Sequence, residues 1–199
     1  MFIVIEGIDG AGHTTQADLL KKYFEKNSEN FVFIKTPNKD LPVGKAYYSY
    51  LNKEYDLNTE AVFLLCASDV ISSKHTIQSA LNSGINIISE RYITSTIAYQ
   101  SANGFNFEKA MKITKLIGFP KADKIIYLDI SPELSVKRKE KMKKLDRHEE
   151  DVEFLTKVKE FYEKQIKLNF LGKWYRVNGE KSIEDVHEQI IKIIKDKRK

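Results

Sequence analysis

The sequence predicts an α/β protein whose parallel sheet is covered by helices on both faces. Short apolar runs alternate with stretches of helical periodicity along the 199 residues, which is the pattern of a parallel sheet. A glycine-rich segment joins the first apolar run to the first helical stretch. No repeat, low-complexity tract or flexible linker divides the chain. We therefore expect one domain spanning residues 1–199.

Five short apolar runs are expected to form the buried strands. They are Phe2–Glu6, Phe31–Lys35, Ile85–Ser89, Lys124–Ile130 and Trp174–Val177. Ligands of such sheets bind beyond the carboxyl ends of the strands. We therefore expect the polar segments that follow four of the strands to converge there: Gly7–Thr15, Thr36–Lys39, Glu90–Arg91 and the segment after Ile130.

Two amphipathic helices are predicted in the last third of the chain, because apolar residues recur there at helical spacing. The first contains Val152, Leu155, Val158, Tyr162 and Ile166, and the second contains Ile183, Val186, Ile190 and Ile194. Ser182 and Asp185 form a capping-box-like start for the second helix.

Composition narrows the class of partner. The net charge of +5 is compatible with a lysine-rich solvated surface or with an anionic partner, and basic residues beside a phosphate motif favour nucleotides over nucleic acid. A nucleic acid is therefore not an expected partner. No run has the length of a membrane span, so a membrane is not an expected partner either. Cys66 is the only cysteine, which predicts a reducing, cytoplasmic compartment.

The segment after the first strand has the spacing of a phosphate-binding P-loop. Its glycines let backbone N–H groups turn toward an anion, and the following helix adds its positive end. The Thr14 hydroxyl stands where it would bind Mg²⁺. The residues expected to hold ATP phosphates are Gly7, Ile8, Asp9, Gly10, Ala11, Gly12, His13, Thr14 and Thr15. A glycine-rich turn without a ligand is the alternative.

His13 breaks the P-loop pattern, which has lysine at this position. Lysine would reach the β- and γ-phosphates with a permanent charge, whereas histidine is shorter and mostly neutral at pH 7. The strand, the glycine spacing and the two following threonines still favour phosphate.

Five segments together resemble the thymidylate kinases, a family of P-loop nucleoside monophosphate kinases. They are Gly7–Gln16, Glu90–Gln100, Ala122–Asp129, Arg138–Glu149 and Ser182–Val186, and their order and spacing cover nearly the whole chain. The resemblance implies a three-layer P-loop fold with a five-stranded parallel sheet and a helical lid at about residues 138–149. It also implies Mg²⁺-dependent transfer of the γ-phosphoryl group of ATP to dTMP, giving dTDP and ADP for dTTP biosynthesis, by a homodimer.

The resemblance assigns roles to three residues at the strand ends. Arg91 would grip the acceptor phosphate, for which a surface ion pair is the alternative. Glu90 would hold Mg²⁺ or steady the acceptor, although the family usually has Asp there. Asp9 would lie near the acceptor sugar and phosphate, for which a loop-capping carboxylate is the alternative.

The lid is the most basic segment, with Lys137, Arg138, Lys139, Lys141, Lys143, Lys144 and Arg147. Such a run is also typical of a solvated helix face. Gly10 resembles the subgroup whose lid, rather than the P-loop, supplies an arginine to the transferring phosphoryl group. Arg138 and Arg147 are the candidates for this catalytic role.

The acceptor side departs most from the family. Lys39 replaces an arginine that contacts the acceptor phosphate, Cys66 replaces a phenylalanine that stacks on the base, and Val70 replaces an arginine. Thr96 and Tyr99 remain as expected base or sugar contacts.

Other functions fit the sequence less well. Asn38–Leu41 and Asn52–Tyr55 both fail the last position of the guanine motif N-K-x-D, and the histidines show no metal-ligand spacing. A nucleic-acid motor would be longer. Two alternatives stay open: a monophosphate kinase of different or broader acceptor specificity, and a paralogue that binds nucleotides with little catalysis.

Overall fold

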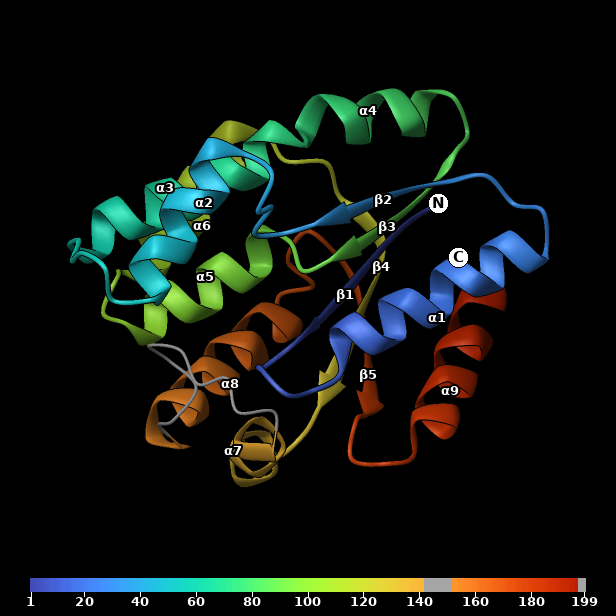
Figure 1. Ribbon diagram of the computed structural model, residues 1–199. Helices are drawn as coiled ribbons and strands as arrows, with labels where there is room; N and C mark the ends of the chain where they lie inside the picture. The colour runs from blue at the N-terminus through green and yellow to red at the C-terminus, as the bar shows by residue number, and fades with distance from the viewer. Residues whose placement is uncertain (142–151, 197–199) are drawn as a thin grey trace.

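The computed structural model describes residues 1–141 and 152–196 and contains one parallel sheet (Figure 1). Its strands are β1 (Phe2–Gly7), β2 (Phe31–Lys35), β3 (Asn86–Glu90), β4 (Ala122–Asp129) and β5 (Gly172–Asn178). They lie in the order β2-β3-β1-β4-β5, and every neighbouring pair is parallel. The predicted parallel α/β sheet is therefore confirmed.

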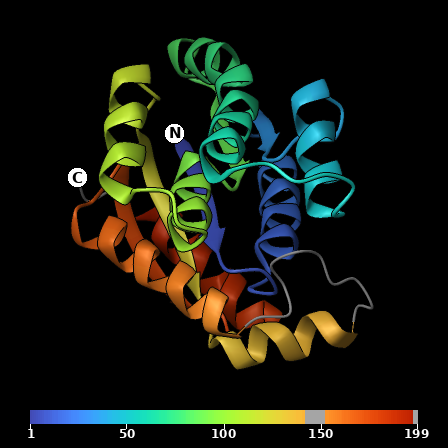
Figure 2. The ribbon, with the colours of Figure 1, turned by 90° about the vertical axis from the view of Figure 1, so that its left-hand side faces the viewer.

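Helices cover both faces of the sheet, which gives three layers (Figures 1 and 2). On one face lie α1 (His13–Lys26) and α9 (Ile183–Lys195). The other face carries α3 (Thr59–Ser72), α4 (Lys74–Asn82), α5 (Ile93–Ala102), α6 (Phe107–Ile117) and α8 (Val152–Lys167). Two further helices, α2 (Pro42–Leu51) and α7 (Pro132–Lys141), lie near the carboxyl ends of the strands.

Alternating side chains of the central strand separate the two cores. Ile3 and Ile5 pack in the cluster that contains α1 and α9, whereas Phe2 and Val4 pack in the cluster that contains α3 and α5. Successive side chains of a strand point to opposite faces, so a strand covered on both sides is apolar throughout. This explains why the apolar runs of the sequence were continuous rather than alternating.

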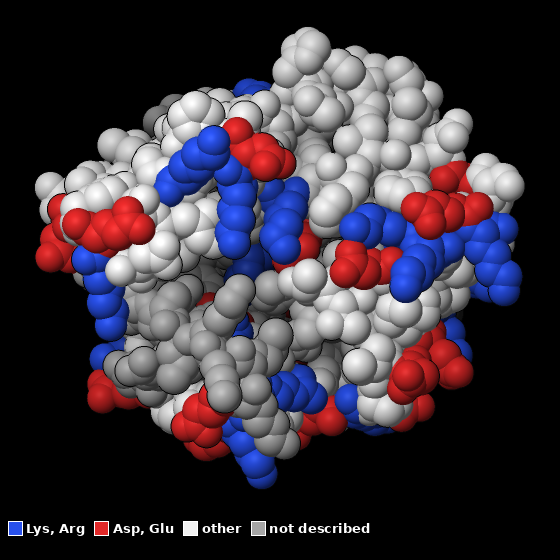
Figure 3. Space-filling view, viewed as in Figure 1, with Lys and Arg blue, Asp and Glu red and all other residues white. Residues whose placement is uncertain are grey.

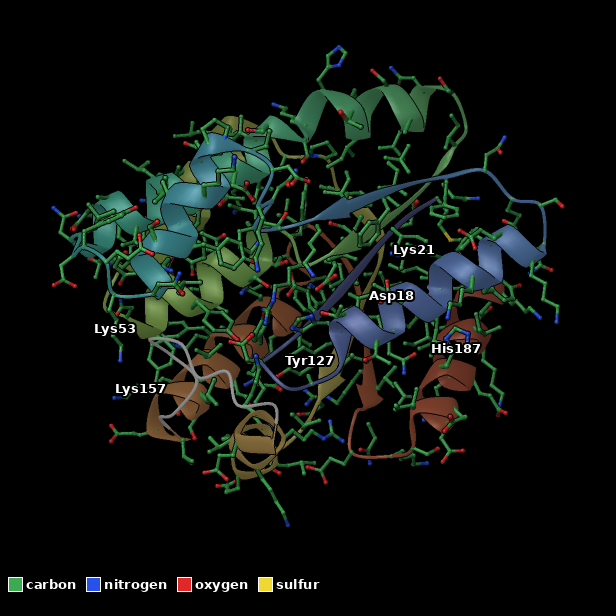
Figure 4. The ribbon with its side chains drawn as sticks, viewed as in Figure 1. Asp18, Lys21, Lys53, Tyr127, Lys157 and His187 are labelled. Atoms are coloured by element: carbon green, nitrogen blue, oxygen red, sulfur yellow. The ribbon has the colours of Figure 1, made fainter. Side chains whose placement is uncertain are left out.

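The helices place apolar side chains against the sheet and charged ones away from it. Tyr127 points from β4 toward α8, where its ring lies 5.1 Å from that of Tyr162 (Figure 4). Asp18 and Lys21 form an ion pair of 2.7 Å on the outer side of α1. The helices thus bury one stripe and leave a charged one in solvent.

The predicted strands were correct within two residues at each end. β5 begins at Gly172 rather than Trp174, because Ala122 and Gly172 extend the pairing of β4 with β5. The predicted capping of α9 is confirmed on the serine side, since Ser182 Oγ accepts a hydrogen bond of 3.1 Å from the Asp185 N–H. Of the predicted lid, residues 138–141 are the last turn of α7, and residues 142–149 lie outside the described residues.

Within residues 1–141 and 152–196, no helix is both long enough and apolar enough to cross a membrane.

Candidate active site

The loop between β1 and α1 has the backbone of an anion cradle. Gly10 and Gly12 adopt positive φ angles of 75° and 95°, which glycine tolerates at little cost. Gly12 is the N-cap of α1 and makes no side-chain capping bond. The first N–H groups of this helix therefore remain available to a phosphate.

The helix α7 packs directly against this loop. A Cβ atom on Gly10 would lie 3.0 Å from the Ser135 carbonyl oxygen, so only glycine fits there without a shift. Ser135 Oγ also donates a hydrogen bond to the Asp9 carbonyl. The absence of a side chain at position 10 thus allows the loop and α7 to approach closely.

A cavity of about 470 Å³ opens beside the loop. Figure 3 shows Lys and Arg side chains gathered around a hollow on this side of the molecule. The predicted site residues that line the cavity are Asp9, His13, Thr14, Lys39, Glu90, Arg91, Thr96 and Tyr99. Residues up to 90 positions apart in sequence are therefore brought together, as the strand-end rule predicts.

Arg91 and Asp9 form the central ion pair of the cavity. Arg91 Nη2 lies 2.5 Å from Asp9 Oδ1, and the Tyr99 hydroxyl donates to Asp9 Oδ2 at 2.8 Å. Burial alone would raise the pKa of Asp9, but the Arg91 guanidinium and His13 together outweigh it and hold this pKa well below its usual range. Asp9 is thus a partly buried, ionised partner of Arg91 rather than a loop cap.

A second network beneath Arg91 fixes its other terminal nitrogen. Nη1 donates to the Gly7 carbonyl at 3.1 Å and to Ser95 Oγ at 3.0 Å. Ser95 and Tyr162 in turn donate to the fully buried Glu6 carboxylate, at 2.5 and 2.8 Å. Arg91 is therefore held by residues from β1, α5 and α8, and it is not a surface ion pair.

Glu90, the last residue of β3, faces the first turn of α1. Its Oε1 accepts from the Thr14 hydroxyl at 2.6 Å and lies 2.9 Å from Lys35 Nζ. Burial would raise the pKa of Glu90, but hydrogen bonds from His13 and Thr14 outweigh it and lower this pKa to about 2. A hydroxyl and an ionised carboxylate beside a phosphate loop are the ligand types that Mg²⁺ takes.

His13 lies between these two centres. Its Nε2 is 2.9 Å from Arg91 Nη2, and its Nδ1 is 3.4 Å from Glu90 Oε1. The imidazole therefore contacts Arg91, on the predicted acceptor side, and Glu90, the predicted metal ligand.

Of the three positions that depart from the family, two line the acceptor end of the cavity and the third does not. Lys39 Nζ lies 4.2 Å from the centre of the Tyr48 ring, and Cys66 lines the cavity. Val70 instead packs in the hydrophobic core with Phe63. Position 70 of α3 therefore supplies no positive charge to the cavity.

The end of α7 separates two neighbouring basic residues. Arg138 donates to the carbonyls of Gly10 and Gly179, both at 3.1 Å, whereas Lys139 lines the cavity. Arg138 would have to leave these carbonyls before it could contact a phosphoryl group. Arg147 lies outside the described residues.

Comparison with known proteins decides the family. The thymidylate kinase family model matches residues 5–190. The chain belongs to the thymidylate kinase family. It is 34% identical to the probable thymidylate kinase of Pyrococcus abyssi, over 98% of this chain and 95% of that protein, and 30% identical to the thymidylate kinase of Dictyostelium discoideum, over 97% and 84%.

A solved thymidylate kinase has the same fold. The structure from Candida albicans, described as revealing the origin of broad substrate specificity, superimposes with a TM-score of 0.78. It is 32% identical and covers 97% of this chain and 90% of that chain. The thymidylate kinase family is a family of ATP-dependent nucleoside monophosphate kinases, so the three-layer P-loop fold and the enzyme class expected from the sequence are confirmed.

Sequence reasoning missed several residues of this thymidylate kinase fold that shape the site. Glu6 is fully buried at the end of β1, and nothing in an apolar run marks it as the anchor of Ser95. Gln100 lines the cavity with both amide atoms unpartnered among the described residues. Its place as the last residue of the Glu90–Gln100 segment was a usable signal.

Proposed function

We propose that this chain transfers the γ-phosphoryl group of ATP to dTMP, giving dTDP and ADP, as a step of dTTP biosynthesis. The observation that carries the proposal is the ion pair of the buried Arg91 with the partly buried Asp9, which faces an open helix N-terminus across one cavity. Phosphoryl transfer needs donor and acceptor phosphates held in line and their charge neutralised. The helix N-terminus would bind the donor phosphates, and Arg91 would bind the acceptor phosphate.

The donor side is the loop from Gly7 to Thr15. Its backbone N–H groups and the start of α1 would bind the ATP phosphates. Thr14 and Glu90 have ligand groups that Mg²⁺ takes, a hydroxyl and an ionised carboxylate, and their oxygens lie 2.6 Å apart. When bound, the ion would neutralise phosphate charge. Lys35 and Lys139, which also line the cavity, add positive charge.

The acceptor side is formed by β2, α3 and α5. Arg91 and Lys39 would bind the dTMP phosphate as charge-assisted donors. Thr96, Tyr99 and the unpartnered amide of Gln100 would face the sugar and base. Arg138 and Arg147 remain the proposed lid arginines, with Arg147 carrying the greater share because Arg138 holds two loop carbonyls.

Broader acceptor specificity is the second candidate, and one observation favours it. Cys66 lines the cavity where the family stacks a phenylalanine on the base, and Val70 is withdrawn into the core. Both changes remove contacts that would select thymine. We also propose that the protein acts as a homodimer in the cytoplasm, as the family resemblance implies.

The test is a coupled ADP-release assay with dTMP, dUMP, dCMP, dAMP and dGMP, each in the presence of Mg²⁺. We expect dTMP to be phosphorylated, and Arg91→Ala to abolish most of this turnover. Arg176→Ala is the matched control, since Arg176 pairs with Asp129 and Glu163 away from the cavity. No turnover of any monophosphate would refute the enzyme proposal, and turnover of another acceptor in place of dTMP would favour the second candidate.

A further inference from the structure

His13 makes its shortest side-chain contact with Arg91. The distance from His13 Nε2 to Arg91 Nη2 is 2.9 Å. A guanidinium has only donors, so Nε2 must be the acceptor and the imidazole proton must lie on Nδ1. Nδ1 points to Thr14 Oγ1 and Glu90 Oε1, each 3.4 Å away. The ring thus bridges the predicted metal side and Arg91.

This bridge completes the fixation of Arg91. Nη1 donates to the Gly7 carbonyl and to Ser95 Oγ, while Nη2 donates to Asp9 Oδ1. His13 accepts from the same Nη2. The guanidinium plane is therefore held at both terminal nitrogens, and its Nε–H bonds no residue within 1–141 or 152–196. That donor remains for a phosphate.

The kind of side chain at position 13 also affects the charge of the site. Asp9 already places one negative charge beside Arg91. A second carboxylate at position 13 would make this group net negative and repel an acceptor phosphate, and a lysine there would repel the guanidinium. An imidazole can hold Arg91 without changing the net charge of the pair.

We propose that His13 is a positioning residue that aims Arg91 at the acceptor phosphate, and that its imidazole does not replace the P-loop lysine as a donor-phosphate ligand. The inference rests on the proposed function through the role of Arg91. The His13 backbone N–H stays part of the phosphate loop, so the loop and the side chain serve different substrates.

Two amide variants separate the two ring nitrogens. In His13→Gln the side-chain oxygen can take the place of Nε2 and accept from Arg91. In His13→Asn the shorter side chain can reach only the place of Nδ1, toward Glu90. His13→Lys restores the usual P-loop residue. Calorimetric titration would measure the affinities for dTMP and for Mg²⁺-free ATP separately, and steady-state kinetics would give KM for each substrate and kcat.

We expect His13→Asn to weaken dTMP binding roughly tenfold, the lower end for losing a charge-assisted hydrogen bond, because Asp9 still holds Arg91. His13→Gln should rescue most of this loss, and ATP affinity should change little in either variant. His13→Lys should weaken dTMP binding without tightening ATP.

Two results would overturn the inference while leaving the kinase proposal intact. One is equal dTMP affinity in the wild type, His13→Asn and His13→Gln. The other is a loss confined to ATP affinity that His13→Lys reverses, which would make His13 a donor-phosphate ligand. A wild type that binds no monophosphate would instead refute the proposed function and this inference together. Unchanged melting temperatures in the amide variants would exclude a merely structural effect.

Discussion

Asp69 is a buried acid that weakens the folded state at neutral pH. It is 1% exposed, and its carboxylate accepts only the Asn38 N–H, at 3.1 and 3.2 Å, with no cation paired to it among the described residues. Burial raises the pKa of Asp69 from 3.8 to about 6, against the opposing effect of the Asn38 N–H. The folded protein therefore resists ionisation of a side chain that ionises freely when unfolded.

The sign of the pH dependence follows from proton counting. Between 3.8 and about 6 the folded state binds more protons at Asp69 than the unfolded state does, so the free energy of unfolding falls as pH rises. The cost is absent below the unfolded pKa and complete above the folded one. The shift corresponds to about 2 to 3 kcal/mol. Asp69→Asn removes the titration but keeps an oxygen that can accept the Asn38 N–H.

The prediction is that Asp69→Asn gains about 2 to 3 kcal/mol of stability over the wild type as pH rises from about 4 to about 7. Urea unfolding at closely spaced pH values, followed by linear extrapolation, measures it. Asp18→Asn on the outer side of α1 is the control and should change stability by no more than about 0.5 kcal/mol. A stability difference that does not vary with pH, or that falls with rising pH, would refute the reasoning.

Three further predictions concern the site. Arg91→Ala should lower kcat/KM for the acceptor at least about tenfold, and should lower the melting temperature because the partly buried Asp9 loses its cation; near-normal kcat/KM would remove Arg91 from the site. Arg138→Ala should mainly lower the melting temperature, whereas Arg147→Ala should mainly lower kcat, and thermal scans beside turnover assays would expose the opposite pattern. Glu90→Gln should raise the Mg²⁺ concentration for half-maximal rate several-fold; an unchanged Mg²⁺ curve would exclude it as a ligand.

The sequence by itself determined the strands, the phosphate loop and the family. These features are local, because a strand shows as a short apolar run and a P-loop as glycines between a strand and a helix. The strand-end rule then predicted that segments as distant as Gly7–Thr15 and Glu90–Arg91 would meet, and they line one cavity. Thr14 was assigned to Mg²⁺ from the P-loop pattern and Glu90 from the family resemblance, and their side chains lie 2.6 Å apart.

Only the tertiary structure decided which side chains meet and which turn away. Arg138 and Lys139 are adjacent in sequence, yet one bonds loop carbonyls and the other lines the cavity. Cys66 and Val70 lie one helical turn apart, yet only Cys66 reaches the acceptor end. His13 bonds Arg91 across 78 positions. Periodicity fixes the face of a helix to within a turn, whereas a hydrogen bond requires positions within a few tenths of an ångström, which are set by the packing of several elements at once.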